Sequence, residues 1–334
     1  MPELTVAAGL ARGLIDLAVS KAANPQALAE RAGIKLEDLQ DQDNRIPFKN
    51  YVALMHAGKE LCNDPALALH YGETNDMSEI SVVGLIAHAC ETMIEAFAQL
   101  NRYGRLVIEF DGGPDRFRLA PERGGLWVVD TRRNPNDFFE LTESTFARMI
   151  CGPRRVGVMS VAKAVHVTHA APPYRGEYER IFGAPVTFES DWNAVQIDEA
   201  SMSQKIAPQP RYVFGVLSER AELLLKSLER SKSTRGRVES LLMPVLHTGE
   251  ASMDTVAGKM ALSRQTLFRK LKAEGTTFEK VLDELRHKLA LDYLSGKKVS
   301  VNETAYLVGF SDPAAFSRAF KRWTGMSPRQ HRTA

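Results

Sequence analysis

The chain has 334 residues, of which 44% are hydrophobic and 25% charged. At about 100–200 residues per domain this length predicts two domains, with three as the alternative, and the composition excludes disordered, collagen-like and disulfide-scaffold chains. The longest apolar stretch, around residues 80–90, is shorter than the about 18 residues that span a bilayer, and no basic region precedes the apolar N-terminal stretch. The three cysteines are widely spaced and form no CxxC pair. We therefore expect a cytoplasmic protein with reduced thiols, no signal peptide and no membrane partner.

The first 75 residues are predicted to be helical. Apolar residues recur there at helical spacing, and Asn24 and Asp64 each precede a proline suited to a first helical position. A further helix is expected over residues 80–101, which contain a capping-box pattern at Thr92 and Glu95.

Strands are predicted in the region that follows. Turn-forming DGGP and PERGG separate three short strands, which predicts an antiparallel meander over residues 105–110, 116–120 and 126–130. A helix ended by Gly152-Pro153 is expected over residues 137–150. The remaining predicted elements are a strand at 161–168, a short helix at 177–182 and strands at 186–188 and 194–197. Residues 1–200 are thus expected to form an α+β domain with a mixed or antiparallel sheet.

Residues 201–234 are predicted to be a linker that contains a helix. Pro208 and Pro210 lie close together, and a helix is expected over residues 212–229. Apolar residues recur in it at alternating spacings of three and four, namely Phe214, Leu217, Ala221, Leu224 and Leu228. Such a stripe suits an amphipathic helix docked on a domain, which we favour, and a short dimerising coiled coil stays open as the alternative.

Charge is divided unevenly along the chain. The net charge is +2, yet residues 211–334 hold 22 basic and 13 acidic residues, a balance of +9, and residues 1–210 carry −7. A chance division between two domains is one explanation. The other is that the basic part binds a polyanion.

The basic part contains an internal repeat, in residues 254–275 and 303–325. Each copy has a short helix, a tight turn (ALS or GFSD) and a second helix, which is the helix-turn-helix unit. The residues that match are Ala257 with Ala305, Leu267 with Phe316, and Leu271 with Phe320. In such units the second helix enters the major groove of DNA.

The second helix of each copy has one apolar and one polar edge. We expect these residues to be buried: Leu267 and Leu271 in the first copy, and Phe316, Phe320 and Trp323 in the second. The residues left for DNA are Arg264, Gln265, Arg269 and Lys272 in the first copy, and Ser317, Arg318, Lys321 and Arg322 in the second. A solvated helix face would explain one such helix, whereas a duplicated unit in the basic part of the chain favours DNA binding.

Residues 235–332 resemble the DNA-binding domain of AraC/XylS-type transcriptional regulators. The resemblance is strongest in LVGFSDPAAFSRAFKRWTGMSPRQHR, which includes the closing residues Gly325, Ser327, Pro328 and Arg332. The first 200 residues resemble the N-terminal domain of the ornithine-utilisation-regulator, or arabinose-binding, type, through THAAPPYRGEYERIFGAPVTFES.

This resemblance implies a two-part regulator. Residues 1–200 would bind an effector, dimerise or both, and residues 235–334 would bind double-stranded DNA. The protein would act as an activator together with RNA polymerase under the control of a small-molecule effector of unknown identity. A homodimer and a ligand-independent regulator are open alternatives.

The family's base-contacting positions can be transferred by motif. They fall on Gln265, Phe268 and Arg269 in the first recognition helix, and on Pro313, Ala314, Ser317 and Arg318 in the second. Phe268 stands where a polar residue is common, so it would touch a thymine methyl or pack. Because Pro313-Ala314 makes a bland helix tip, we expect the second copy to grip phosphate mainly through Arg318 and Lys321.

The geometry of one DNA-bound monomer also follows. A helix predicted over residues 278–294, with Phe278, Leu282, Leu285 and Leu289 along one face, would span about 25 Å. Packed against both units, it would hold them near the about 34 Å between successive major-groove faces. We expect an asymmetric site of about 20 base pairs. DNA bending and a second unit that stays off the groove are the alternatives.

Other chemistry has little support. His166 and His169 would point to opposite faces of a strand, so no metal site is expected. GxSxG, HExxH, GxxxxGK[ST] and GxGxxG are absent from the sequence. We expect no cofactor, catalytic residue or enzymatic activity. An enzyme domain targeted to DNA is the competing class.

Overall fold

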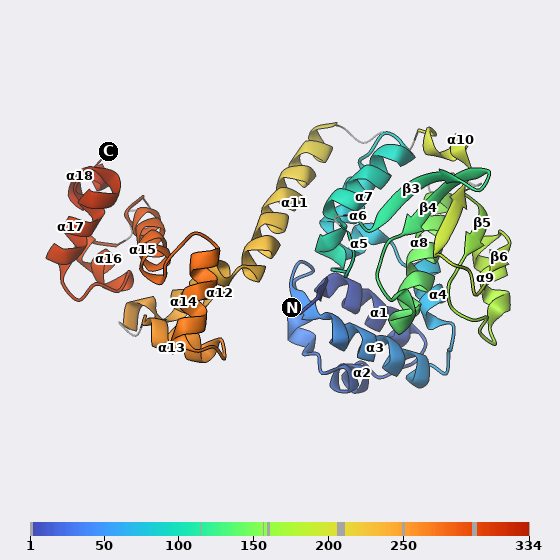
Figure 1. Ribbon diagram of the computed structural model, residues 1–334, viewed down its shortest axis with the longest axis horizontal. Coiled ribbons are helices and arrows are strands. Elements are labelled where there is room, and N and C mark those ends of the chain that lie inside the picture. Colours follow the sequence, from blue (N-terminus) through green and yellow to red (C-terminus); the bar gives the residue numbers. More distant parts are fainter. Residues whose placement is uncertain are drawn as a thin grey trace. The chain divides into compact units, whose positions relative to one another are not determined.

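The structure is a computed structural model that describes residues 3–113, 115–155, 157–158, 161–205, 211–248, 251–295 and 299–333. The chain divides into two compact units, Met1–Leu225 and Lys226–Ala334, and the division falls inside α11 (Arg211–Lys232). The first unit is α+β and the second is all-α, which confirms the predicted fold class (Figure 1). Pro208 and Pro210 of the predicted linker lie outside the described residues.

The first unit begins with helices and continues into a sheet. Its helices are α1 (Ala8–Ser20), α2 (Pro25–Ala32), α3 (Phe48–Leu61), α4 (Leu67–Thr74), α5 (Met77–Ile80), α6 (Val82–His88), α7 (Met93–Val107), α8 (Glu140–Arg155), α9 (Arg175–Phe182) and α10 (Glu199–Met202), with 3-10 turns η1 (Leu36–Leu39) and η2 (Pro135–Phe138). Its strands are β1 (Thr5–Ala7), β2 (Arg45–Pro47), β3 (Phe117–Glu122), β4 (Gly125–Asp130), β5 (Ala162–His166), β6 (Val186–Thr187) and β7 (Ala194–Ile197).

The main sheet is mixed and has the strand order β3-β4-β7-β5-β6. Only β5 and β6 run parallel. Val128, Val195 and Val165 lie opposite one another on one face, and α4, α8 and α9 pack on that face. α7 covers the same face near β3 and β4, where it packs on Phe117 and Val128. α4, α7, α8 and α9 therefore cover one face of the sheet.

The second unit is built around α15. Its elements are α12 (Thr234–Leu242), η3 (Met243–Thr248), α13 (Met253–Lys259), α14 (Arg264–Ala273), α15 (Phe278–Ser295), α16 (Val301–Leu307), α17 (Pro313–Thr324) and α18 (Pro328–Thr333). Phe278 and Leu285 of α15 belong to a core shared with α12, α13 and α14. Ala290 and Leu294 belong to a second core shared with η3, α16 and α17. The prediction that this helix packs against both helix-turn-helix units is confirmed.

The sequence prediction is wrong for residues 105–110, which are not a strand. α7 continues to Val107, and only Ile108 makes an isolated bridge, to Val6. Tyr103, Leu106 and Val107 are buried at helical spacing, so packing against the core selects the helix. β4 consequently pairs with β3 and β7, and the predicted three-stranded meander is reduced to one hairpin.

Helix ends also differ from the prediction. The helix expected over residues 80–101 is divided, because Ser81 and Thr92 have extended backbones that start new helices. α8 passes through Gly152-Pro153 to Arg155, although a proline removes one helical hydrogen bond. Arg154 in its last turn donates to the carbonyl oxygen of Ile181 at 2.6 Å. The pair β1 and β2 was not predicted within the first 75 residues.

The start of α11 is docked on the first unit. Ala221 of its apolar stripe is fully buried. Arg211 donates to Glu95 at 2.8 Å, and Glu222 accepts from Tyr103 at 2.9 Å. These contacts support the docked-helix interpretation of the stripe, and the coiled coil stays a prediction.

Candidate nucleic-acid interface and cavity

Two helix-turn-helix units occupy the predicted places. The first helix-turn-helix unit consists of α13 and α14, and the second helix-turn-helix unit consists of α16 and α17. The predicted inner edges are confirmed as buried for Leu267, Leu271, Phe316 and Phe320, whereas Trp323 is half-buried. Each unit therefore presents the opposite edge of its second helix away from its core.

The two turns share an unusual backbone conformation. Ala261 and Gly309, equivalent in the repeat, have φ of +53° and +81°, in the left-handed region. A Cβ on Gly309 would lie 2.2 Å from the carbonyl oxygen of Leu246. Arg286 of α15 donates to the carbonyl oxygen of Gly309 at 3.0 Å. The second turn is thus held by packing on η3 and α15.

Capping residues define where the recognition helices start. Ser263 accepts a hydrogen bond from the backbone N–H of Thr266 at 3.1 Å. Asp312 accepts from the N–H groups of Ala314 and Ala315 at 2.9 and 3.0 Å. Both caps satisfy donors that a helix leaves unpaired in its first turn. The first residues of α14 and α17 are therefore held in a defined orientation.

The predicted contact residues of α14 lie together on its outer edge. Gln265, Phe268, Arg269 and Lys272 are exposed and recur at spacings of three, one and three. The Phe268 side chain is 48% exposed, so it does not pack into the core. Arg264 is exposed as well, and its Nη1 donates to Asp254 of α13 at 2.6 Å.

The predicted contact residues of α17 are less uniformly free. Ala314, Arg318 and Lys321 are exposed, whereas Pro313 and Ser317 are half-buried. The Ser317 hydroxyl donates to the carbonyl oxygen of Pro313 at 2.9 Å, within its own helix. This edge thus presents a small apolar tip followed by two cations.

Arg322 and Arg318 each have an acidic neighbour. Arg322 donates to Asp283 of α15 at 2.6 Å, and Trp323 donates to the same carboxylate at 3.3 Å. The Arg318 guanidinium lies 3.9 Å from Asp312. Arg322, predicted to face outward, is exposed but is tied to α15.

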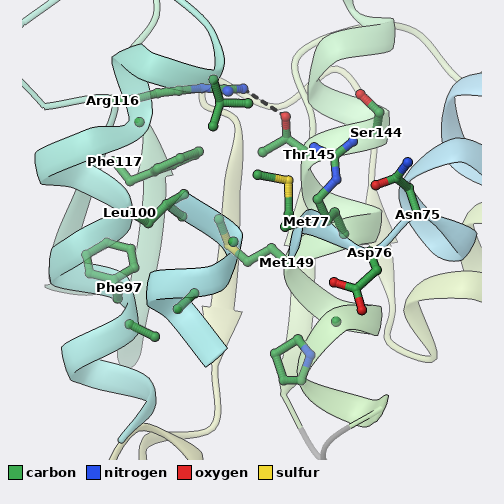
Figure 2. A pocket seen from close by; sticks show the side chains of 18 of the residues that line it. Asn75, Asp76, Met77, Phe97, Leu100, Arg116, Phe117, Ser144, Thr145 and Met149 are labelled. Atoms are coloured by element: carbon green, nitrogen blue, oxygen red, sulfur yellow. Dashed lines mark hydrogen bonds between the residues drawn. The ribbon is translucent and has the colours of Figure 1, made fainter. Parts of the chain in front are cut away.

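The α+β unit, Met1–Leu225, contains a cavity of about 410 Å³, which is within the range of small-molecule sites. α7 and α8 line it together with β3 and β7 and with α5, α6 and α10. In Figure 2 the polar side chains Arg116, Thr145, Ser144 and Asn75 lie across the upper part of the view. Phe97, Leu100 and Met149 lie below them (Figure 2).

A buried ion network borders this cavity. Arg116 donates to Thr145 at 3.0 Å and to Asp130 at 3.3 Å, and Arg132 donates to Asp130 at 2.8 Å. Burial lowers the pKa of Arg116 to about 10, so this side chain keeps its charge at neutral pH. Burial alone would raise the pKa of Asp130, but Arg116 and Arg132 outweigh it and lower that pKa.

Sequence reasoning assigned no ligand-binding residue and therefore missed this cavity. Its polar residues come from separate elements, including Arg116 before β3 and Arg148 in α8. No spacing pattern links them. An isolated arginine beside apolar residues is the only local signal, and it does not distinguish a ligand site from a structural ion pair.

The histidines considered as metal ligands have separate partners. His166 Nδ1 lies 3.0 Å from the Ser190 hydroxyl, and His169 Nδ1 lies 2.9 Å from the carbonyl oxygen of Ala170. Over the part of the chain that the structure describes, no three His, Cys, Asp or Glu side chains gather in a way that could hold a metal ion. Within the same residues, none of the helices combines the length and the apolar character that crossing a membrane requires.

Comparison with known proteins assigns both regions. Residues 23–206 match the family model of the arabinose-binding domain of AraC transcription regulators, and residues 256–334 match a helix-turn-helix domain. The chain is 26% identical to the ornithine utilization regulator of Pseudomonas aeruginosa, over 97% of this chain and 95% of that protein. It is 24% identical to the HTH-type transcriptional regulator VirS of Mycobacterium tuberculosis, over 96% and 94%. Among solved structures, the regulator CdpR from Pseudomonas aeruginosa aligns with a TM-score of 0.36 at 23% identity, over 80% of this chain and 86% of that one.

Proposed function

The chain belongs to the AraC family of DNA-binding transcription regulators, and on that premise we propose that it activates transcription under the control of a small molecule bound in its first unit. Residues 1–200 would serve as the effector-binding and dimerisation domain, 201–234 as the linker and 235–334 as the DNA-binding domain. The protein would work in the cytoplasm with RNA polymerase and would catalyse no reaction.

The observation that carries the DNA-binding part of the proposal is the sharing of α15 by two helix-turn-helix units. The two halves of this 18-residue helix belong to different cores, so α15 joins the two units. Its length, about 27 Å at about 1.5 Å per residue, together with the width of each unit, suits two successive major-groove segments. One monomer would then occupy an asymmetric site of about 20 base pairs.

The two recognition helices would divide the work. Gln265, Phe268 and Arg269 of α14 would contact base edges, with Arg264 and Lys272 beside them. α17 would grip phosphate through Arg318 and Lys321, because the tip formed by Pro313 and Ala314 offers few hydrogen-bonding groups and the Ser317 hydroxyl already bonds within its helix.

A pair of alanine variants tests this division. Arg269→Ala should cost about 1–3 kcal/mol on a specific duplex and relax sequence preference, because an arginine–guanine contact is lost. Lys321→Ala should weaken specific and random duplexes alike. Fluorescence anisotropy on both duplexes measures the difference. Lys270→Ala is the matched control, since Lys270 is an exposed cation of α14 whose helical position lies away from the contact edge. Equal losses on both duplexes for Arg269→Ala would refute the assignment.

Salt dependence and footprinting test the wider arrangement. If about six phosphates are neutralised, log K should fall against log salt with a slope of about −5. Hydroxyl-radical footprinting of the full chain should show two protected groove segments. A slope near zero contradicts DNA binding by this surface. Protection of one segment contradicts only the simultaneous use of both units.

A further inference from the structure

Several buried polar atoms around the cavity of the α+β unit, Met1–Leu225, have no hydrogen-bond partner among the described residues. Among the described residues, no hydrogen bond reaches Arg116 Nε, Arg148 Nε and Nη2, or the Tyr51 hydroxyl. All three side chains line the same cavity. Buried donors are almost always paired, and an unpaired one is costly. Four donor atoms without partners in one cavity therefore indicate a missing acceptor.

These side chains also lie close enough to influence one another. Burial raises the pKa of Tyr51 to about 12, against the opposing charges of Arg148 and Arg116. The phenol therefore stays protonated at neutral pH and can donate. The charge of Arg148 also contributes to lowering the pKa of Arg116, after burial.

The local charge is unbalanced in the same sense. Asp130 is shared by Arg116 and Arg132, whose side chains are 9% and 7% exposed. Arg148 adds a third cation, stacked on the ring of Tyr71 at 5.3 Å. Asp130 alone cannot neutralise three arginines, and buried cations need anionic partners. The other carboxylate that lines the cavity, Asp76, lies 3.7 Å from His88 and accepts from the backbone N–H of Ser78. The missing acceptor is therefore expected to be an anion.

Part of the cavity wall is apolar, although Asp76, His88 and Arg155 also line the cavity. Phe97 and Leu100 of α7 and Met149 of α8 line it and pack against the core around Phe117. A small ion would leave this space without a complementary group. An occupant that fills the cavity needs an anionic head and an apolar body.

We infer that the cavity binds an amphipathic monocarboxylate, whose carboxylate lies between Arg116 and Arg148 and whose hydrocarbon body lies along Phe97, Leu100 and Met149. This deepens the proposed function by naming the chemical class of its effector, and it rests on that proposal only for the effect on DNA binding. The four unpartnered donor atoms match the about four lone-pair sites of a carboxylate. A phosphate monoester has more acceptor sites than these donors can satisfy. Asn75 lines the same cavity, but its unpartnered Oδ1 is an acceptor and is not one of these four donors.

Isothermal titration calorimetry of the full chain without DNA tests the inference, with octanoate, 1-octanol and octyl phosphate as probes. Octanoate should bind most tightly. Each methylene removed should weaken binding about fourfold, so hexanoate, which has two fewer, should bind about 15-fold more weakly than octanoate. Failure of all probes to bind, equal affinity for octanoate and octanol, or tighter binding of octyl phosphate would each overturn the inference.

Arg148→Met is the decisive variant, because it removes the unpartnered cation and keeps an apolar side chain of similar reach. Its affinity for octanoate should fall about tenfold or more, while that for octanol stays within about twofold. Without ligand, its Tm should equal or exceed that of the original chain, since a half-buried charge with two buried nitrogen atoms that lack a partner is gone. Arg118→Met is the matched control, because Arg118 is an exposed arginine of β3 paired with Glu122. It should change neither affinity.

A second variant covers the case in which Arg148→Met fails to fold. Phe97→Trp places extra volume in the apolar part and should weaken octanoate and octanol equally. Undiminished octanoate binding in folded Arg148→Met, or in Phe97→Trp, would overturn the inference. Octanoate binding without any change in DNA affinity would support the site and contradict the proposed control. DNA binding by a chain whose cavity binds none of the probes would contradict the site and leave the DNA-binding part of the proposed function intact.

Discussion

Replacing Gly309 by alanine is expected to destabilise the second helix-turn-helix unit by about 2–4 kcal/mol. Gly309 has φ of +81°, which costs an L-residue about 1–2 kcal/mol. The new Cβ would also lie 2.2 Å from the Leu246 carbonyl oxygen. That oxygen belongs to backbone, so η3 must shift, and overpacking of this kind costs about 1–3 kcal/mol. A gain of about 0.5–1 kcal/mol, from lower freedom of the unfolded chain, offsets part of this sum.

The equivalent position in the first helix-turn-helix unit, Ala261, provides a test in which stability should change in the opposite direction. Ala261 already carries a side chain at φ of +53°. Ala261→Gly should relieve about 1–2 kcal/mol of backbone strain and lose about 0.5–1 kcal/mol to the unfolded chain. The net effect should be neutral or stabilising by up to about 1.5 kcal/mol.

Urea titration of the full chain, followed by hydrogen exchange in peptides from α13–α14 and α16–α17, measures both effects locally. Gly309→Ala should lower the midpoint for α16–α17 at an unchanged m-value. A loss below about 1 kcal/mol for Gly309→Ala, or a destabilisation of similar size in both variants, would refute the reasoning from backbone conformation and contact.

Three further variants test other parts of the structure. Phe316→Ala should destabilise the second helix-turn-helix unit by about 3–5 kcal/mol, because Phe316 is fully buried in a core. A loss below about 1 kcal/mol in a urea titration would show that this core collapses into the space that the removed ring leaves. Asp312→Ala should cost about 0.5–2 kcal/mol through loss of the helix cap, whereas Asp312→Asn should cost little; equal losses in thermal unfolding would argue against the cap. Burial raises the pKa of Glu143 from 4.5 to about 7, despite hydrogen bonds from Tyr178 and Tyr174. Between these two pH values the folded state therefore binds more protons than the unfolded state. The free energy of unfolding should fall by about 3 kcal/mol as the pH rises from 4.5 to about 7. Glu143→Gln should flatten this dependence in pH-resolved urea titrations, and an unchanged slope would assign it to other groups.

The helix-turn-helix units were predictable because their signals are local. Helical spacing selected Leu267, Leu271, Phe316 and Phe320 as the buried edge, and the structure buries all four. Repetition of the whole unit removed the ambiguity that a single amphipathic helix has. Capping residues and the turn glycine act within a few residues of the helices they terminate, so the sequence displays them directly.

Residues 105–110 show where local signals are insufficient. A short apolar run suits a strand or the end of a buried helix equally well. Packing of Tyr103 and Leu106 decides for the helix, and that packing depends on partners far along the chain. The same applies to α8, where contacts to α9 hold a helical turn beyond Pro153.

The sequence by itself determined the class of the protein, its division into an α+β part and an all-α part, and the buried edge of the second helix in each helix-turn-helix unit. Only the tertiary structure decided where the first unit has its cavity and which groups line it. Arg116 and Arg148 are 32 positions apart, and Tyr51 precedes both by more than 60. They line one cavity because α3, α8 and the start of β3 pack beside it, and such non-local packing leaves no periodicity in the sequence.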